Sequence, residues 1–233
     1  MAGHKLVIFD CDGTLVDSQD LIVQAMNQAF TEAQLTPPPR QHTLSIVGLS
    51  LLEAMQVLAP EAAEADQHQL AAIYKSSFGQ LVSNTNRKEP LYEGAAETVR
   101  RLASRAGVVL GIATGKSQRG VHRVLAEHDL QGCFVTLQTA DDAPSKPHPA
   151  MIHQAMAEAG VEPDDTVMVG DTVYDLQMAQ AAGVAAVGVD WGYHPAADLH
   201  RCAPDALVSE FKELHTALEA IWRERVRSRG ELA

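Results

Sequence analysis

Two aspartates near the start of the sequence could do chemistry together. Asp10 and Asp12 belong to the segment Asp-Cys-Asp-Gly-Thr at 10–14, which directly follows an apolar run. Side chains two residues apart on a strand point to opposite faces, but a turn that begins at Asp10 lets both carboxylates reach one site. An Asp-Gly turn is common by itself. The pattern Asp-x-Asp-Gly-Thr, with four fixed residue types, would occur by chance in only about one chain in a thousand of this size. We therefore expect a functional site here, because open α/β sheets bind ligands at the carboxyl ends of their strands.

A second pair of acids follows another apolar run. Asp171 and Asp175 are four residues apart, so at a strand end and helix start they lie near one another. With Asp10 and Asp12 they would place four carboxylates together without a basic partner nearby in sequence, and such crowding raises pKa values and destabilises a fold. A hard divalent cation with oxygen ligands resolves this, and we expect Mg²⁺. The alternative is that Asp171 is only a turn acid and Asp175 only a helix cap.

Two further segments contain groups that suit a phosphate. Thr114 and Gly115 end an apolar run before a helical segment, so a hydroxyl, an amide and a helix N-terminus come together. An ordinary β-branched strand end is the alternative interpretation of Thr114. Lys146 stands in Ser-Lys-Pro-His-Pro at 145–149, where the prolines restrict the backbone and hold one ammonium group in place. Because Lys146 falls in the loops at the same end of the sheet, we favour compensation of phosphoryl charge over an ordinary surface lysine.

The elements that must position these side chains follow from the apolar pattern. Short apolar runs alternate with segments of helical period, which predicts an α/β fold with a parallel, Rossmann-like sheet. We expect strands at Lys5–Asp10, Val108–Thr114, Phe134–Thr139, Val167–Asp171 and Ala185–Val189, with a short sixth at Ala206–Val208. We expect helices at Gly94–Ser104, Ser117–Glu127, Pro149–Ala159, Tyr174–Ala182 and Ser209–Arg225.

One segment breaks this alternation. Residues 17–88 show helical periods and no strand-like run. The pattern predicts a catalytic core of residues 1–16 and 89–233 that carries an inserted all-helical domain at 17–88.

Composition limits the partners of the chain. Its 233 residues are 46% hydrophobic and 21% charged, which is typical of a folded protein of one or two domains. The net charge of −12 and the pI near 5.2 have the wrong sign for binding nucleic acid or an anionic membrane. The same surplus of acids would repel a small anionic substrate unless the local field at the site is reversed.

The cysteines and the apolar segments of the sequence bear on where in the cell the protein is found. Its three cysteines are far apart and form neither a disulfide framework nor a metal-ligand pattern. No stretch approaches the roughly 18 apolar residues of a membrane span, and the N-terminus is not typical of an export signal. We expect a cytoplasmic protein; the pattern leaves its oligomeric state open.

In order and spacing, four segments resemble the motifs of the haloacid dehalogenase superfamily. These are the segment 10–14, Thr114-Gly115-Lys116, Lys146-Pro147 and the segment 170–175. The helical insertion is similar to the cap of the phosphoglycolate-phosphatase-like branch. The resemblance implies a Rossmann-like core, a mobile helical cap and a phosphoric monoester hydrolase. That enzyme would use Mg²⁺ to hydrolyse a small phosphorylated metabolite through an aspartyl-phosphate.

The resemblance also implies a role for each acid. Asp10 would be the nucleophile and a Mg²⁺ ligand. Asp12 would be the general acid and base, with its main-chain carbonyl on the metal. Asp171 would complete the metal site, and Asp175 would bind Asp171's ion directly or through the ion's waters.

The remaining implied roles concern the phosphoryl group. Thr114 and the amide of Gly115 would hold its oxygens. Lys146 would neutralise charge on both the nucleophile and the phosphate.

Other functions remain open at this point. A dehalogenase of the superfamily lacks an acid at the place of Asp12, because a halide leaves without a proton. A phosphomutase carries an Arg that Gly48-Leu49-Ser50-Leu51 lacks, and a phosphonate hydrolase needs a cap lysine, for which Lys75 and Lys88 lie in no recognised motif. From another class, a phospho-accepting signalling receiver also uses Asp, Thr, Lys and Mg²⁺, but its accepting Asp follows the third strand.

Two segments have no assigned role. Trp191-Gly192-Tyr193-His194 follows the fifth expected strand, and a packed loop is favoured over the mouth of a pocket. Alternate arginines along 223–229 favour the solvated end of a helix.

Overall fold

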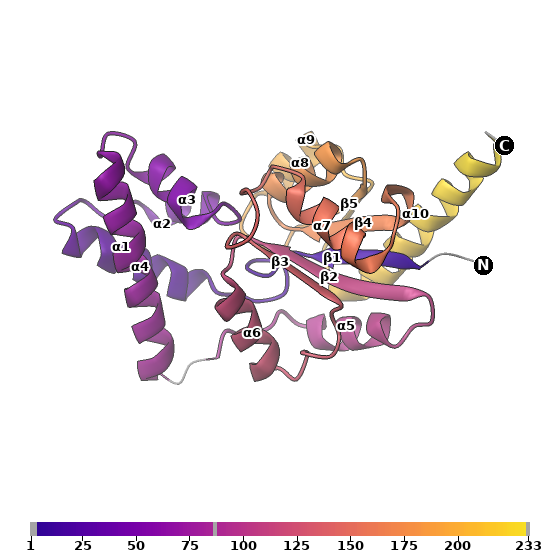
Figure 1. Ribbon diagram of the computed structural model, residues 1–233, viewed down its shortest axis with the longest axis horizontal. Helices are drawn as coiled ribbons and strands as arrows, with labels where there is room; N and C mark the ends of the chain where they lie inside the picture. Colours follow the sequence, from indigo (N-terminus) through magenta and orange to yellow (C-terminus); the bar gives the residue numbers. More distant parts are fainter. Residues whose placement is uncertain (1–3, 86–87, 232–233) are drawn as a thin grey trace.

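The fold is described from a computed structural model, which covers residues 4–85 and 88–231 (Figure 1). The strands are β1 (Lys5–Phe9), β2 (Val108–Thr114), β3 (Thr136–Thr139), β4 (Thr166–Gly170), β5 (Ala185–Val189) and β6 (Ala206–Val208). The first helices are α1 (Gln19–Glu32), α2 (Arg40–Ser45), α3 (Leu51–Leu58), α4 (Glu64–Thr85) and α5 (Ala95–Ala103). Then follow α6 (Gln118–Glu127), α7 (Ala150–Ala159), the 3-10 turn η1 (Pro163–Asp165), α8 (Val173–Ala182), α9 (Ala196–Arg201) and α10 (Phe211–Glu231).

The strands of the described residues form one parallel sheet in the order β3-β2-β1-β4-β5-β6. This confirms the expected fold class. The order reverses beside β1, which pairs with β2 on one side and β4 on the other. A crevice opens at such a switch point because the connections on its two sides run to opposite faces of the sheet. The loops after β1 and β4 therefore meet at the place where this fold binds ligands.

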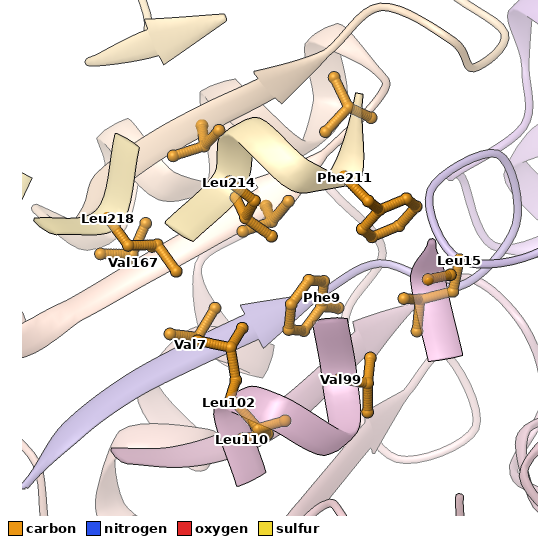
Figure 2. Close-up of a cluster of buried hydrophobic side chains, with 14 of the residues drawn as sticks. Val7, Phe9, Leu15, Val99, Leu102, Leu110, Val167, Phe211, Leu214 and Leu218 are labelled. Atoms are coloured by element: carbon orange, nitrogen blue, oxygen red, sulfur yellow. The ribbon is translucent and has the colours of Figure 1, made fainter. Parts of the chain in front are cut away.

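Both faces of the sheet are buried. Successive residues of β1 alternate between two cores, with Val7 and Phe9 on one face and Leu6 and Ile8 on the other. Figure 2 shows Val7 and Phe9 packed between side chains of α5 and α10. Helices α7, α8 and α9 cover the opposite face. The continuous apolar runs of the sequence reflect this two-sided burial.

The element limits differ from the expected ones in a few places. β3 begins two residues late, at Thr136, although the amide of the exposed Val135 already donates to the carbonyl of Leu110 in β2 at 2.9 Å. α10 runs on to Glu231 and so includes the arginine-rich tail, in which Arg225 lies 3.3 Å from Asp164. The six-residue helix α9 was not expected, since it is too short to show a helical period.

Helices α1 to α4 form a helical insertion between β1 and α5 (Figure 1, left). Its apolar side chains make a small core of their own, which includes Met26, Phe30, Met55 and Leu70. The outgoing and returning chains pair side by side, because Val16 bridges Leu91 antiparallel, and the amide of Tyr92 donates to the carbonyl of Leu15 at 3.0 Å. The domain limits at 16/17 and 88/89 stay predictions, and residues 86 and 87 beside the second limit lie outside the described part.

No helix within residues 4–85 and 88–231 combines the length and the apolar character needed to cross a membrane.

Candidate active site

The site begins where β1 ends. The amide of Asp10 donates to the carbonyl of Val169 at 3.0 Å, which is the last bond between β1 and β4 before the chain turns. The chain then closes a tight loop, in which the amide of Leu15 donates to the carbonyl of Cys11 at 2.9 Å. Gly13 has φ +86°, a left-handed conformation that glycine adopts without steric cost. The expected turn after Asp10 is therefore present, and it sets the direction of the acids that follow.

Asp10 lies at the bottom of the site with 1% of its surface exposed. Its Oδ1 is 2.8 Å from Nζ of Lys146, yet neither carboxylate oxygen accepts a hydrogen bond of good geometry from the described residues. Burial raises the pKa of Asp10 to about 6; Lys146 and the Thr114 hydroxyl oppose the rise, and the Asp175 carboxylate adds to it. A buried carboxylate with unfilled acceptor positions is suited to bind a cation or to attack an electrophile.

Asp171 is held by neutral donors. Its Oδ1 accepts from the Thr14 hydroxyl at 2.8 Å, and its Oδ2 accepts from the Tyr193 amide at 2.8 Å. A Cβ at Gly13 or at Gly192 would lie 2.2 Å from atoms of this side chain, so both glycines permit a close approach of backbone to carboxylate. Burial and the neighbouring acids raise the pKa of Asp171 well above its ordinary value, against the effect of the two donors.

Asp175 and Lys146 form a buried ion pair at the start of α8. Nζ of Lys146 donates to Oδ1 of Asp175 at 2.6 Å, and the amide and hydroxyl of Thr172 donate to Oδ2 at 3.0 and 2.7 Å. The Thr172 side chain caps the helix in return, which completes a capping box. Burial acts to lower the pKa of Lys146, but Asp10 and Asp175 raise it above its ordinary value. Lys146 thus stays charged between two carboxylates.

Three of the four expected acids meet. Carboxylate oxygens of Asp10, Asp171 and Asp175 lie within 4.8 Å of one another, and all three residues are buried. Oxygen donors of this charge suit a hard cation, and the unfilled oxygens of Asp10 leave room for one. The three side chains therefore fit a metal ion.

The carboxylate of Asp12 stands apart from that cluster, contrary to the expectation that all four acids converge without a base. Its Oδ1 accepts from Nζ of Lys116 at 2.7 Å and from the Ser18 hydroxyl at 2.6 Å. Nζ of Lys116 also donates to Oε2 of the fully buried Glu89 at 2.8 Å. Burial acts to lower the pKa of Lys116, but Asp12 and Glu89 raise it above its ordinary value. Lys116 belongs to an expected motif, whereas nothing near Glu89 in the sequence indicates this contact.

Thr114 and Gly115 lie at the end of β2, where Ser117 caps α6 by accepting from the Gly120 amide at 3.2 Å. The helical insertion touches this turn with a short loop at 46–50. A Cβ at Gly115 would lie 2.6 Å from the carbonyl oxygen of Leu49. The amide of Ser50 in the same loop donates to the Ser145 hydroxyl at 2.7 Å. The loop thus covers the turn after β2 and the segment that bears Lys146.

The loop after β5, which the sequence left without a role, contacts both sides of the site. Nε1 of Trp191 donates to the carbonyl of Thr14 at 3.1 Å. Tyr193 reaches Asp171 through its amide, and its hydroxyl lies 3.1 Å from the hydroxyl of Ser18. The loop is packed, as favoured, but it also orients a carboxylate of the cluster and a residue at the start of the helical insertion.

His194 of that loop also contacts the insertion. Its Nδ1 accepts from the Val173 amide at 3.2 Å, so the neutral ring carries its proton on Nε2, which donates to the carbonyl of Ser45 at 3.0 Å. Burial lowers the pKa of His194, in keeping with a neutral ring. The hydroxyl of Tyr174 donates to the same carbonyl at 3.2 Å. Two side chains of the core therefore bind the end of α2.

Comparisons with known proteins agree with this geometry. A family model described as "Haloacid dehalogenase-like hydrolase" matches residues 7–189. A protein of Dickeya dadantii strain 3937 named "Probable phosphatase IndB" is 35% identical over 220 residues, which cover 93% of this chain and 94% of that relative. A "Phosphoglycolate phosphatase" of Haemophilus influenzae strain 86-028NP is 30% identical over 223 residues, covering 92% and 98% of the two chains. The crystal structure of a predicted phosphoglycolate phosphatase from Haemophilus somnus 129PT has the same fold, with a TM-score of 0.81, 24% identity and coverage of 93% and 98%.

Proposed function

The chain belongs to the haloacid dehalogenase-like hydrolase family, and on this premise we propose that it is a Mg²⁺-dependent phosphatase. It would hydrolyse a small phosphomonoester through an aspartyl-phosphate, and the phosphatase names of its relatives support this reaction class. The observation that carries the proposal is the state of Asp10, a buried carboxylate whose two oxygens have unfilled acceptor positions beside Lys146. Burying such a group costs free energy unless its oxygens find partners. A function explains this burial if one oxygen binds a cation and the other attacks phosphorus.

The proposed first step uses Asp10 as nucleophile. One of its oxygens attacks phosphorus, the bond from phosphorus to the ester oxygen breaks, and the acyl phosphate of Asp10 forms. Lys146, whose Nζ is 2.8 Å from Oδ1 of Asp10, would compensate charge on Asp10 as the phosphoryl group arrives. Thr114 and the amide of Gly115 would hold the phosphoryl oxygens at the end of β2.

The cation would be held by Asp10 and Asp171, with the main-chain carbonyl of Asp12 as a further ligand and Asp175 beside it. When bound, Mg²⁺ would supply charge compensation for the transferring phosphoryl group. The Thr14 hydroxyl and the Tyr193 amide hold Asp171 in a fixed orientation for this role.

Asp12 is proposed as the acid and base. Its carboxyl group gives a proton to the departing ester oxygen, which leaves as an alcohol. The resulting carboxylate then takes a proton from water as the water oxygen attacks phosphorus. This second attack restores the carboxylate of Asp10 and releases inorganic phosphate.

The test is hydrolysis of an aryl phosphate and of a panel of phosphorylated metabolites that includes phosphoglycolate. We expect phosphate release that requires Mg²⁺ and stops in excess chelator, and an Asp10→Asn protein that folds but does not turn over. Full activity in chelator would contradict the metal assignment, and an active Asp10→Asn protein would contradict the nucleophile. The metabolite hydrolysed with the highest kcat/KM identifies the substrate.

A further inference from the structure

Beside the acid cluster lies a second group of buried charges, of which the proposed mechanism uses only Asp12. Lys116 bridges Asp12 and Glu89 with bonds of 2.7 and 2.8 Å, and its side chain is 7% exposed. Arg123 pairs with the other oxygen of Glu89. Phe78 of helix α4, in the helical insertion, lies over Lys116, with its ring centroid 5.4 Å from Nζ. We call these residues the Lys116 cluster.

Stability is a poor explanation for this cluster. Burying charges costs several kcal/mol for each ion, and apolar side chains of the same size often stabilise a fold as well or better. What a buried, hydrogen-bonded ion pair does provide is a fixed geometry. Glu89 is completely buried and is also bound by Arg123, so it anchors Lys116 rigidly.

The hydrogen bonds of this cluster fix one oxygen of the Asp12 carboxylate. Both bonds to its carboxylate, from Lys116 and from Ser18, end on Oδ1. Among the described residues, no hydrogen bond ends on the other oxygen, Oδ2. A carboxyl group that must exchange a proton with substrate needs one oxygen held and the other available, within about 3 Å of the reacting atom.

We propose that Lys116, anchored by Glu89, is the positioning residue that holds Asp12 in place for proton transfer to the leaving group. This inference rests on the proposed phosphatase function, and it adds a residue that touches neither phosphate nor metal. It differs from a general effect of charge, in which Lys116 would only make the site more positive.

The experiment compares two esters that share a ring and a phosphoryl group. Phenyl phosphate needs a proton on its leaving oxygen, whereas 2,4-dinitrophenyl phosphate releases a stable anion. We measure kcat/KM, because it reports the steps up to departure of the leaving group. General acid catalysis contributes about 10²–10⁴ in rate, so Lys116→Met should lower kcat/KM for phenyl phosphate at least about tenfold more than for the dinitrophenyl ester. Asp12→Ala sets the upper limit of that difference.

Glu89→Gln separates positioning from a general effect of charge. Removing a negative charge makes the site more positive, so a general effect predicts a higher kcat/KM for both esters. Positioning predicts a lower kcat/KM that is selective for phenyl phosphate, because Lys116 loses its anchor. Lys212→Met, which removes an exposed lysine paired with Glu210, is the matched control and should leave both values unchanged.

Each result decides the inference. Selective loss on phenyl phosphate in Lys116→Met, or in Glu89→Gln if Lys116→Met does not fold, supports it. Equal loss on both esters, no loss, or a gain in Glu89→Gln overturns it while the proposed function stands. If the parent protein hydrolyses neither ester in Mg²⁺, the proposed function fails and the inference fails with it. Circular dichroism of each variant checks the fold.

Discussion

Each of the two buried lysines of the site is shared by two carboxylates. Lys146 binds Asp10 and Asp175, and Lys116 binds Asp12 and Glu89. Asp171 is bound by an amide and a hydroxyl. The five buried acids of the site therefore outnumber its two lysines and Arg123. That local excess, and not the net charge of −12, is what a divalent cation would balance before an anionic ester binds.

Gly192 tests how closely the backbone must approach Asp171. A Cβ at this position would lie 2.2 Å from Cβ of Asp171, inside the fold, where neither group can move far. We expect Gly192→Ala to lower the free energy of unfolding by about 1–3 kcal/mol and to lower phosphatase activity at least about tenfold at limiting Mg²⁺, because overpacking displaces the carboxylate. Urea denaturation and a Mg²⁺ titration of activity measure the two effects.

The control is Gly132→Ala, because a Cβ at Gly132 meets no atom within 4 Å. It should change neither quantity. A Gly192→Ala protein with the parent's Mg²⁺ dependence would show that Asp171 does not need its present position.

At the scale of single residues, the sequence predicts where the acids of the site lie better than which residues bind them. Asp10 and Asp171 end apolar runs, so their place at the sheet's carboxyl edge follows from the pattern. Glu89 and Tyr193 could not be found this way, because each acts through a contact made by the tertiary fold. Glu89 is separated from Lys116 by 27 positions and ends the segment that returns from the helical insertion.

At the scale of elements, the contact between the helical insertion and the sheet deserves a test of its own. The loop at 46–50 places the carbonyl oxygens of Gly48 and Leu49 against the turn after β2, and a Cβ at Gly115 would lie 2.8 and 2.6 Å from them. We expect Gly115→Ala to push this loop away from the turn after β2. Because the atoms in the way are backbone atoms, and Ile46 and Leu49 of this loop pack in the core of the insertion, the variant should lose activity at least about tenfold and lose about 1–3 kcal/mol of stability.

The measurement is kcat/KM together with urea unfolding, and Gly107→Ala is unsuitable as a control because Gly107 has φ +80°. Gly132→Ala again serves. Unchanged activity in Gly115→Ala would mean that the loop does not need to close on the turn.

Strands were easier to predict than the connections between them. The runs at 108–114 and 185–189 coincide with β2 and β5, because a strand buried on both faces must be apolar throughout. α9 could not be predicted, since a six-residue helix shows no period. The loop at 191–194 was predicted as a packed loop, but the sequence did not indicate which residues it contacts. Their positions depend on contacts with α8, with Asp171 and with the helical insertion.

At the scale of the whole molecule, the buried acids couple stability to pH and to the metal. The pKa of Asp10 is about 6 in the folded protein and 3.8 in its ordinary state. Between these values the folded chain binds a proton that the unfolded chain has released, so the stabilising effect is complete below pH 3.8 and is lost as pH rises through 6. The shift corresponds to on the order of 3 kcal/mol for Asp10, and the raised pKa of Asp171 acts in the same direction.

We therefore expect chelator-treated protein to be less stable at pH 7 than Asp10→Asn protein under the same conditions, because the variant keeps no charge at this buried position. Mg²⁺ at 100 times its Kd should stabilise the parent by about 2.7 kcal/mol, and it should stabilise the variant less, since one ligand is weakened. Urea unfolding of both proteins at pH 5 and pH 7, with chelator and with Mg²⁺, gives the difference in the free energy of unfolding between parent and variant under each of the four conditions. The gap between variant and parent in chelator should widen from pH 5 to pH 7, as Asp10 loses its proton. If instead the parent is more stable than the variant in chelator at pH 7, Lys146 alone offsets the cost of burying the charge on Asp10. The fold would then need no metal ion to keep this acid ionised.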